Sequence, residues 1–257
     1  MAGRGGVVND TITGIVTWDG IVPPQCQPNP FILRLSANLT WVLAHEPLHA
    51  DIDFKKTNGV GPGMAFANAV LAKDPTFGVI GLVPCAIGGT KISKWGKGTF
   101  LYKQLVMRAA ASFQYGGTIQ ALLWYQGESD TVSEEDASPI RLCNFLNLRH
   151  DLQSPTLPII QVALASGRSV AFIDTVREAQ LGIDLLNLRT VDAKGLPLQP
   201  DTLHLSTPAQ VRLGEKLAET YLQFLPSGPI SSPTPPLVVS EAVVTLCYSF
   251  WWSHYQA

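Results

Sequence analysis

Apolar residues along this chain gather in short unbroken runs and do not alternate with polar ones. The clearest run, Ala121 to Tyr125, holds five apolar or aromatic residues in succession. Such a run is typical of a strand buried on both faces, as in a parallel sheet. Similar apolar stretches predict strands at 77–83 and 158–164, and a short last strand is expected at 190–193.

Helical spacing of apolar residues separates these runs. It predicts helices over 64–73, 100–113, 140–152 and 172–186, and a further helix near Thr207. Thr207-Pro208-Ala209-Gln210 has the form of a capping box with proline at the first helical position. Strand and helix alternate from Phe77 to Tyr221. This alternation predicts an α/β fold whose parallel sheet is covered by helices on both faces.

The first 62 residues are rich in glycine, proline and asparagine and have no clear period, which predicts loops and one short hairpin near 13–18. The segment His45-Glu46-Pro47-Leu48-His49 has the H-E-x-x-H spacing of zinc proteases, which works only on a helix. Pro47 would remove a hydrogen bond from that helix and clash with its preceding turn. We therefore expect a surface loop here and no metal site.

Composition narrows the class of protein. With 257 residues, 46% hydrophobic and 15% charged, the chain fits a single globular domain with a large core. Its net charge of −2 and the absence of a basic cluster argue against nucleic acid as a partner. The four scattered cysteines suggest neither a disulfide framework nor a zinc site. No N-terminal apolar signal region and no run long enough to span a membrane occur, so a cytoplasmic location is favoured.

Polar residues and glycines follow two of the predicted strands. Gly88 and Gly89 come after the 77–83 strand, and Gln126-Gly127-Glu128-Ser129-Asp130 follows the 121–125 strand. In open α/β sheets, ligands bind beyond the carboxyl ends of the strands, and paired glycines offer free N–H groups. Tight turns and helix caps explain the same residues equally well. The Gly61-Pro62-Gly63 stretch is no dinucleotide fingerprint, because Phe66 stands where a third glycine is needed, and no cofactor is expected.

One acid and one histidine lie three residues apart after the last predicted strand, at Asp201 and His204. Acid–base catalysis near neutral pH uses an imidazole that a carboxylate orients. An acid and a histidine at this spacing more often form an ion pair on the protein surface. Its place beyond the last strand, on the same side as the 88–90 and 126–130 loops, favours a site.

Five segments together resemble the plant-type carbohydrate esterases of the sialate O-acetylesterase domain family, within the SGNH hydrolase superfamily. They cover about residues 1–225 in the family's order: Met1-Ala-Gly-Arg-Gly-Gly6, Cys85-Ala-Ile-Gly-Gly-Thr90 with Trp95, Trp124-Tyr-Gln-Gly-Glu-Ser-Asp130, Asn147-Leu-Arg-His-Asp-Leu152 and Asp201-Thr-Leu-His204. The resemblance implies a flavodoxin-like three-layer α/β/α sandwich and a metal-independent serine esterase that removes acetyl groups from carbohydrates or other small esters. In it, His204 is the general base and Asp201 its orienting partner. Gly88 or Gly89, with Gln126, stabilises the oxyanion, and Gly127 and Glu128 belong to the same substrate loop.

The nucleophile is where the sequence departs from that family. Family members carry it in a Gly-Gln-Ser-Asn-Met-Ala-Gly stretch after a first strand that is internal to the sheet. This sequence begins at that methionine, so the resemblance places the serine two residues before Met1. Ser129 is the nearest substitute but lacks the G-x-S-x-G elbow. We expect the chain as given to be weak or inactive; the alternative is a non-catalytic carbohydrate-binding or regulatory homologue.

The last residues match no part of the family. Residues 226–236 have the composition of a Pro/Ser linker, and the stretch 242–252 is apolar but too short to span a membrane. Residues 226–257 are therefore expected to be a linker and an exposed apolar tail. This tail has two interpretations. It is either an interfacial anchor or a product of alternative splicing or of an imperfect gene model.

Overall fold

The computed structural model describes residues 3–114, 116–137, 143–225 and 242–248 of the chain. Its main sheet has seven strands in the order β4-β3-β5-β9-β6-β7-β8. All neighbouring pairs are parallel except β3 with β4 at one edge. The strands of this sheet are β3 (Ile32–Leu35), β4 (Trp41–Leu43), β5 (Ile80–Pro84), β6 (Thr118–Tyr125), β7 (Ile159–Ala163), β8 (Leu188–Asp192) and β9 (Ala242–Tyr248).

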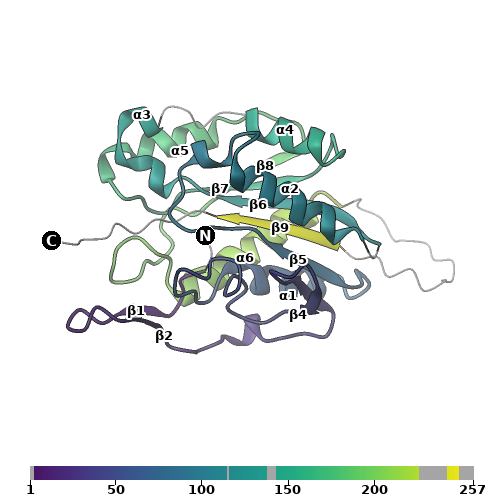
Figure 1. Cartoon of the computed structure of the whole chain (residues 1–257), viewed down its shortest axis with the longest axis horizontal. Coiled ribbons are helices and arrows are strands. Elements are labelled where there is room, and N and C mark those ends of the chain that lie inside the picture. Colours follow the sequence, from purple (N-terminus) through teal and green to yellow (C-terminus); the bar gives the residue numbers. More distant parts are fainter. Residues whose placement is uncertain (1–2, 115, 138–142, 226–241, 249–257) are drawn as a thin grey trace.

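Helices cover both faces of this sheet, as Figure 1 shows. The described helices are α1 (Pro62–Lys73), α2 (Phe100–Ser112), α3 (Glu134–Ala137), α4 (Cys143–Asp151), α5 (Ile173–Leu181) and α6 (Thr207–Leu222). On β6, Ala121, Leu123 and Tyr125 pack into a core with α1 and α6. Leu122 and Trp124 point the other way, into a second core with α2 and α4. The three-layer α/β/α sandwich is therefore confirmed.

The unbroken apolar run of β6 follows from this arrangement. Residues Ala121 to Tyr125 are all buried, because each face of the strand meets a helical layer. Burying a side chain the size of leucine contributes about 1.5–3 kcal/mol. A strand with one solvent-exposed face would instead have alternated.

Four of the predicted strands and most predicted helices lie where the sequence indicates, with ends shifted by a few residues. The helix expected over 172–186 ends at Leu181, with Gly182 at its C-cap. The capping box at Thr207 is wrong, because Ser206 is the N-cap of α6 and its side chain makes no cap hydrogen bond. The expected start of the 140–152 helix lies partly outside the described residues, and α4 is described from Cys143.

The prediction for residues 1–62 is wrong in two places. The hairpin appears as β1 (Val7–Asn9) and β2 (Val16–Trp18), but β3 and β4 were not expected. These strands have only four and three residues, too few for a visible period. The 45–49 segment is not helical, yet it is not a surface loop either, since Glu46, Leu48 and His49 are buried.

The tail prediction is also wrong for residues 242–248. This segment is the internal strand β9, paired with β5 on one side and β6 on the other. The sheet therefore has a strand at the place where the sequence led us to expect a gap. Residues 249–257 lie outside the described part of the chain. None of the described helices is long and apolar enough to cross a membrane.

Candidate active site

Asp201 and His204 lie on the loop between β8 and α6, and the structure brings their side chains together. The Nδ1 atom of His204 hydrogen-bonds to Oδ2 of Asp201. The other oxygen, Oδ1, accepts the backbone N–H of Leu203 at 3.0 Å and of His204 at 2.9 Å. Both carboxylate oxygens are therefore held within one turn, which fixes the orientation of the imidazole.

The pKa values of this pair suit a neutral base beside a charged partner. Burial lowers the pKa of His204 below its ordinary value, although the carboxylate of Asp201 opposes the shift. Burial raises the pKa of Asp201, but the hydrogen bonds from His204 outweigh it and bring that pKa to about 2. At neutral pH, His204 is thus uncharged and able to accept a proton.

The loop after β5 carries the predicted glycines, and the two differ. The N–H of Gly88 donates to the Asp53 carboxylate at 3.0 Å, and the Gly88 carbonyl accepts from Lys56. Gly89 has a φ of +75° and lines a cavity of about 930 Å³. Of the two N–H groups, the one of Gly88 is therefore engaged in this structure.

The loop after β6 begins with Gln126, whose amide is also engaged. Its Nε2 donates to the Asp130 carboxylate and, at 3.5 Å, to the Thr90 carbonyl. Asp130 in turn accepts the backbone N–H of Ile92 at 3.0 and 3.1 Å. These bonds hold the 126–130 loop against the segment that follows Gly89. An amide donor for an oxyanion would need Gln126 to exchange its bond to Asp130.

Gly127 turns the chain sharply beside that amide. Its φ is +139°, a conformation that other residues rarely adopt. A Cβ atom there would lie 3.0 Å from Nε2 of Gln180 and 3.1 Å from Cγ1 of Val176. Gln180 uses that nitrogen to bond the Gln126 carbonyl at 2.8 Å. Glycine is thus required by both conformation and space.

Glu128 and Ser129 are buried polar residues of the same loop. Within the described part of the chain, neither carboxylate oxygen of Glu128 nor Oγ of Ser129 has a hydrogen-bond partner. Burial raises the pKa of Glu128 to about 7. Ser129 lines the 930 Å³ cavity with Gly89 and Arg168, and no base among the described residues hydrogen-bonds to its hydroxyl.

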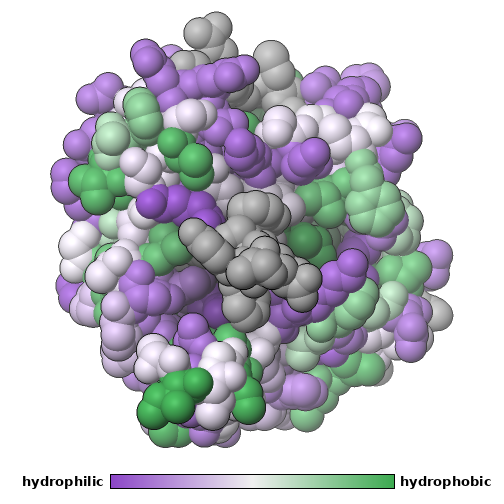
Figure 2. Space-filling model, turned by 60° about the vertical axis from the view of Figure 1, so that its left-hand side comes forward, coloured by the Kyte–Doolittle hydropathy of each residue, from purple (hydrophilic) through white to green (hydrophobic). Residues whose placement is uncertain are grey.

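Several residues that link these loops were not singled out from the sequence. Arg168 follows β7; its backbone N–H donates to the Glu128 carbonyl at 3.2 Å, and its charge acts on both Glu128 and His204. Ser166 donates to the carbonyl of Leu203, next to His204. The loops after β6, β7 and β8 are thereby joined. The face in Figure 2 shows hydrophilic residues interspersed with several separate hydrophobic patches.

Arg4 approaches the same region from the N-terminal segment. Its Nη1 donates to the Thr57 carbonyl at 2.7 Å, and its charge acts on Asp201 and Asp53. Its own carbonyl accepts from Gln199, shortly before Asp201. The only sequence signal for Arg4 was its presence in the Met1–Gly6 motif.

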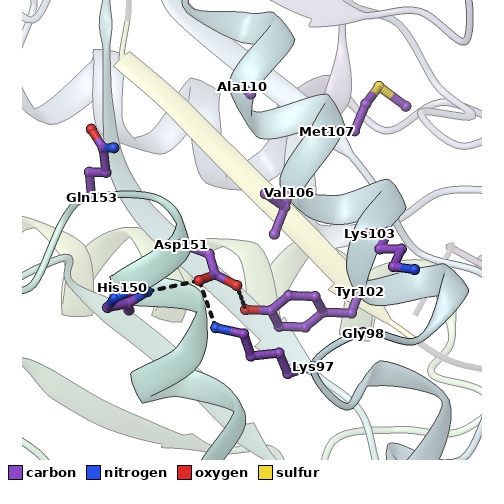
Figure 3. A pocket seen from close by; sticks show the side chains of 10 residues that line it. All are labelled: Lys97, Gly98, Tyr102, Lys103, Val106, Met107, Ala110, His150, Asp151 and Gln153. Carbon is purple, nitrogen blue, oxygen red and sulfur yellow. Dashed lines mark hydrogen bonds and ion pairs between the residues drawn. The ribbon is translucent and has the colours of Figure 1, made fainter.

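The Asn147–Leu152 motif has a structural role in this molecule. Arg149 donates to the carbonyls of Leu157 and Leu186, which ties α4 to the segments just before β7 and β8. Asp151 accepts from Lys97, Tyr102 and His150 at the edge of a separate pocket (Figure 3). The hydrogen bond from Lys97 and those from His150 and Tyr102 hold the pKa of Asp151 well below its usual value. This carboxylate therefore anchors α4 to the start of α2.

Potential metal ligands are scattered over the described part of the chain. Among them, no group of three or more His, Cys, Asp or Glu side chains could hold a metal ion. His45 is exposed and hydrogen-bonds to the Glu46 carbonyl, whereas His49 is buried.

Comparisons with known proteins agree with one another. Residues 1–223 match the family model for carbohydrate esterases described as sialic acid-specific acetylesterases. A probable carbohydrate esterase of Arabidopsis thaliana, At4g34215, is 58% identical over 228 residues, covering 86% of each chain. Its crystal structure superimposes with a TM-score of 0.83 at 57% identity, over 87% of this chain and 93% of that one. The carbohydrate acetylesterase XAC1771 of Xanthomonas citri shares the fold, with a TM-score of 0.55 at 18% identity over 77% of this chain and 50% of that one.

Proposed function

Because the chain belongs to the sialic acid-specific acetylesterase family of carbohydrate esterases, we propose that its site hydrolyses acetyl esters on carbohydrates. The observation that carries the proposal is the bond between Asp201 and His204 beyond the last strand of the sheet. A neutral imidazole held by a carboxylate is the general base that serine esterases use. The similarity to a probable carbohydrate esterase of Arabidopsis thaliana supports the same substrate class.

In the proposed reaction, Nε2 of His204 takes the proton from a serine hydroxyl as that oxygen attacks the acetyl carbonyl. Asp201 stabilises the imidazolium that forms, because its carboxylate stays charged above a pKa of about 2. The N–H of Gly89, with the amide of Gln126, stabilises the oxyanion of the tetrahedral intermediate. His204 then returns the proton to the departing sugar oxygen, which leaves the acetyl group on the serine. In the second half of the reaction, His204 takes a proton from a water that attacks this acetyl group and returns it to the serine oxygen as acetate leaves.

The proposed nucleophile is the serine that the family resemblance places two residues before Met1. For a form of the protein that begins at Met1, we propose weak hydrolysis, in which His204 assists water directly. Sites of this kind retain some catalysis without the full triad. A non-catalytic carbohydrate-binding role is the second candidate, favoured by Ser129, whose buried hydroxyl lacks a partner among the described residues.

Two assays separate these candidates. Acetate release and saccharide binding are measured for the chain as given, for its Ser129→Ala variant, and for a version extended upstream by a strand ending in Gly-Gln-Ser-Asn. We expect slow release from the first two and release faster by orders of magnitude from the extended version. Tight binding without release from any version would favour the binding role. Loss of release on Ser129→Ala would show that Ser129 is the nucleophile.

A further inference from the structure

The segment between β4 and α1 presents two charged side chains to the loop that carries Gly88 and Gly89. Asp53 is buried, and its Oδ2 accepts the N–H of Gly88 at 3.0 Å. Lys56 donates through Nζ to the carbonyl of the same Gly88. Both backbone polar groups of this glycine are therefore bonded to side chains that lie 35 and 32 residues away in the sequence.

Hydrogen bonds hold the turn from which these two side chains extend. The N–H of Asp53 donates to the His49 carbonyl at 2.8 Å, and the N–H of Lys56 donates to the Asp53 carbonyl at 3.0 Å. The buried Asn58 donates to the carbonyls of Asp53 and Lys56 at 3.1 and 2.9 Å. The two charged side chains thus start from a fixed backbone, which favours their contacts with Gly88.

The bond from Lys56 ends on a peptide group that is part of the candidate site. The Gly88 carbonyl and the Gly89 N–H belong to one peptide, whose C–N bond has partial double-bond character. A cation that hydrogen-bonds to the carbonyl oxygen draws electron density through that bond, so the N–H becomes a stronger donor. Gly89 has a φ of +75° and lines the 930 Å³ cavity. Its N–H is the group to which the proposed reaction assigns the oxyanion.

The charge of Lys56 is more than the position of the loop requires, because a neutral donor would hold the same carbonyl. Burial lowers the pKa of Lys56 to about 8. The Asp53 carboxylate opposes this shift, whereas the positive charges of Arg4 and Arg168 add to it. Partly burying a cation near two others lowers stability. A purely structural role therefore does not explain why this position carries a lysine.

We propose that Lys56 is a positioning residue of the esterase site: its ammonium group polarises the Gly88–Gly89 peptide and strengthens the Gly89 N–H as an oxyanion donor. Asp53 fixes the preceding peptide and so aims the polarised one. Loss of a whole oxyanion donor costs about 10²–10³-fold in kcat, so the weakening of one donor should cost about tenfold. This kinetic consequence rests on the proposed function, whereas the polarised peptide does not.

The first test observes the peptide itself by NMR and needs no enzymatic activity. Glycine labelled with ¹³C at the carbonyl and with ¹⁵N gives an amide–carbonyl correlation only where two glycines are adjacent. The chain has three such pairs, at 5–6, 88–89 and 116–117. The correlation that disappears in Gly88→Ala identifies the 88–89 peptide.

The expected spectra follow from the bond to the carbonyl. In the full chain, Lys56→Met should move the Gly88 carbonyl carbon and the Gly89 amide proton upfield, and Lys56→Arg should restore most of both shifts. In the parent, the two signals should titrate with a midpoint near pH 8. Lys55→Met, at the exposed neighbouring lysine, is the matched control and should leave both signals unchanged. Signals of Lys56→Met that coincide with those of the parent would overturn the proposal.

The second test measures acetate release from an acetylated saccharide by the upstream-extended version. Lys56→Met should lower kcat about tenfold and leave KM within about twofold, because the oxyanion forms only as the reaction proceeds. The kcat of the parent should fall again as pH rises through about 8, and Lys56→Met should lack this fall. Lys56→Arg should recover most of kcat, and Lys55→Met should match the parent.

The kinetic outcomes separate this inference from the proposed function. Acetate release by the parent with an unchanged kcat in Lys56→Met would overturn the role of Lys56 and leave the proposed function standing. No release from any version would overturn the proposed function and the kinetic role of Lys56 together, whereas the NMR shifts of the Gly88–Gly89 peptide would still be expected.

Discussion

Two loops beyond the carboxyl ends of the strands each carry a carboxyl group, and the pKa values of these two groups are shifted in opposite directions. Asp201 accepts from His204 and from two backbone N–H groups, its side chain is 46% exposed, and its pKa falls to about 2. Glu128 is fully buried without a hydrogen-bond partner among the described residues, and its pKa rises to about 7. Local hydrogen bonds thus favour the charged form of Asp201, whereas burial favours the protonated form of Glu128.

The Asp201 half of this comparison is tested by removing the charge and keeping the shape. Asp201→Asn in the upstream-extended version should lower the rate of acetate release about 10²–10⁴-fold, because the imidazole loses its orienting carboxylate. Asp174→Asn, at an exposed position on α5, is the matched control and should leave the rate unchanged. A rate within twofold of the parent in Asp201→Asn would show that the pair is structural only.

The conformation of the Glu128 loop is tested at Gly127. Gly127→Ala should destabilise the fold by about 2–5 kcal/mol, since it adds backbone strain to a close contact. Gly98 also has a positive φ, of +87°, but a Cβ there would meet nothing within 4 Å. Gly98→Ala should therefore cost only about 1–2 kcal/mol. If urea unfolding showed the same loss of unfolding free energy for both variants, the close contacts around Gly127 would not contribute to the loss.

The charge state of Glu128 gives a smaller, pH-dependent effect. Its folded-state pKa of about 7 lies above the ordinary value of 4.5, so its contribution to stability is present at low pH and is lost as pH rises through about 7. Glu128→Gln should remove this loss. The free energy of unfolding of the variant, relative to that of the parent, should therefore be higher at pH 8 than at pH 5 by on the order of 1–3 kcal/mol. Exposed Glu135→Gln on α3 is the control. Parallel stability–pH curves for Glu128→Gln and the parent would show that Glu128 titrates normally.

The two loops also differ in how far the sequence could predict them. The contact of Asp201 with His204 spans three residues and follows from turn geometry, and β6 follows from its apolar run. The bond from Gly88 to Asp53 joins residues 35 apart, so no local pattern contains it. The position of β9 depends on parallel pairing with β5 and β6, both more than a hundred residues away. Composition alone could not distinguish an internal strand from an exposed apolar tail.

The central claim is that His204, held by Asp201, is the base of a carbohydrate acetylesterase site. It is tested most directly by acetate release from an acetylated saccharide, measured for the upstream-extended version with and without His204→Ala. A second extended version that stops at Leu225 lacks β9, which lies between β5 and β6 in this structure, so that only the upstream strand can take this position. We expect each extended parent to release acetate at a rate that rises with pH to a plateau, with a midpoint below 6.5, because burial lowers the pKa of His204. His204→Ala should lower that rate about 10³-fold or more. Full activity of His204→Ala in both extended versions would contradict the account.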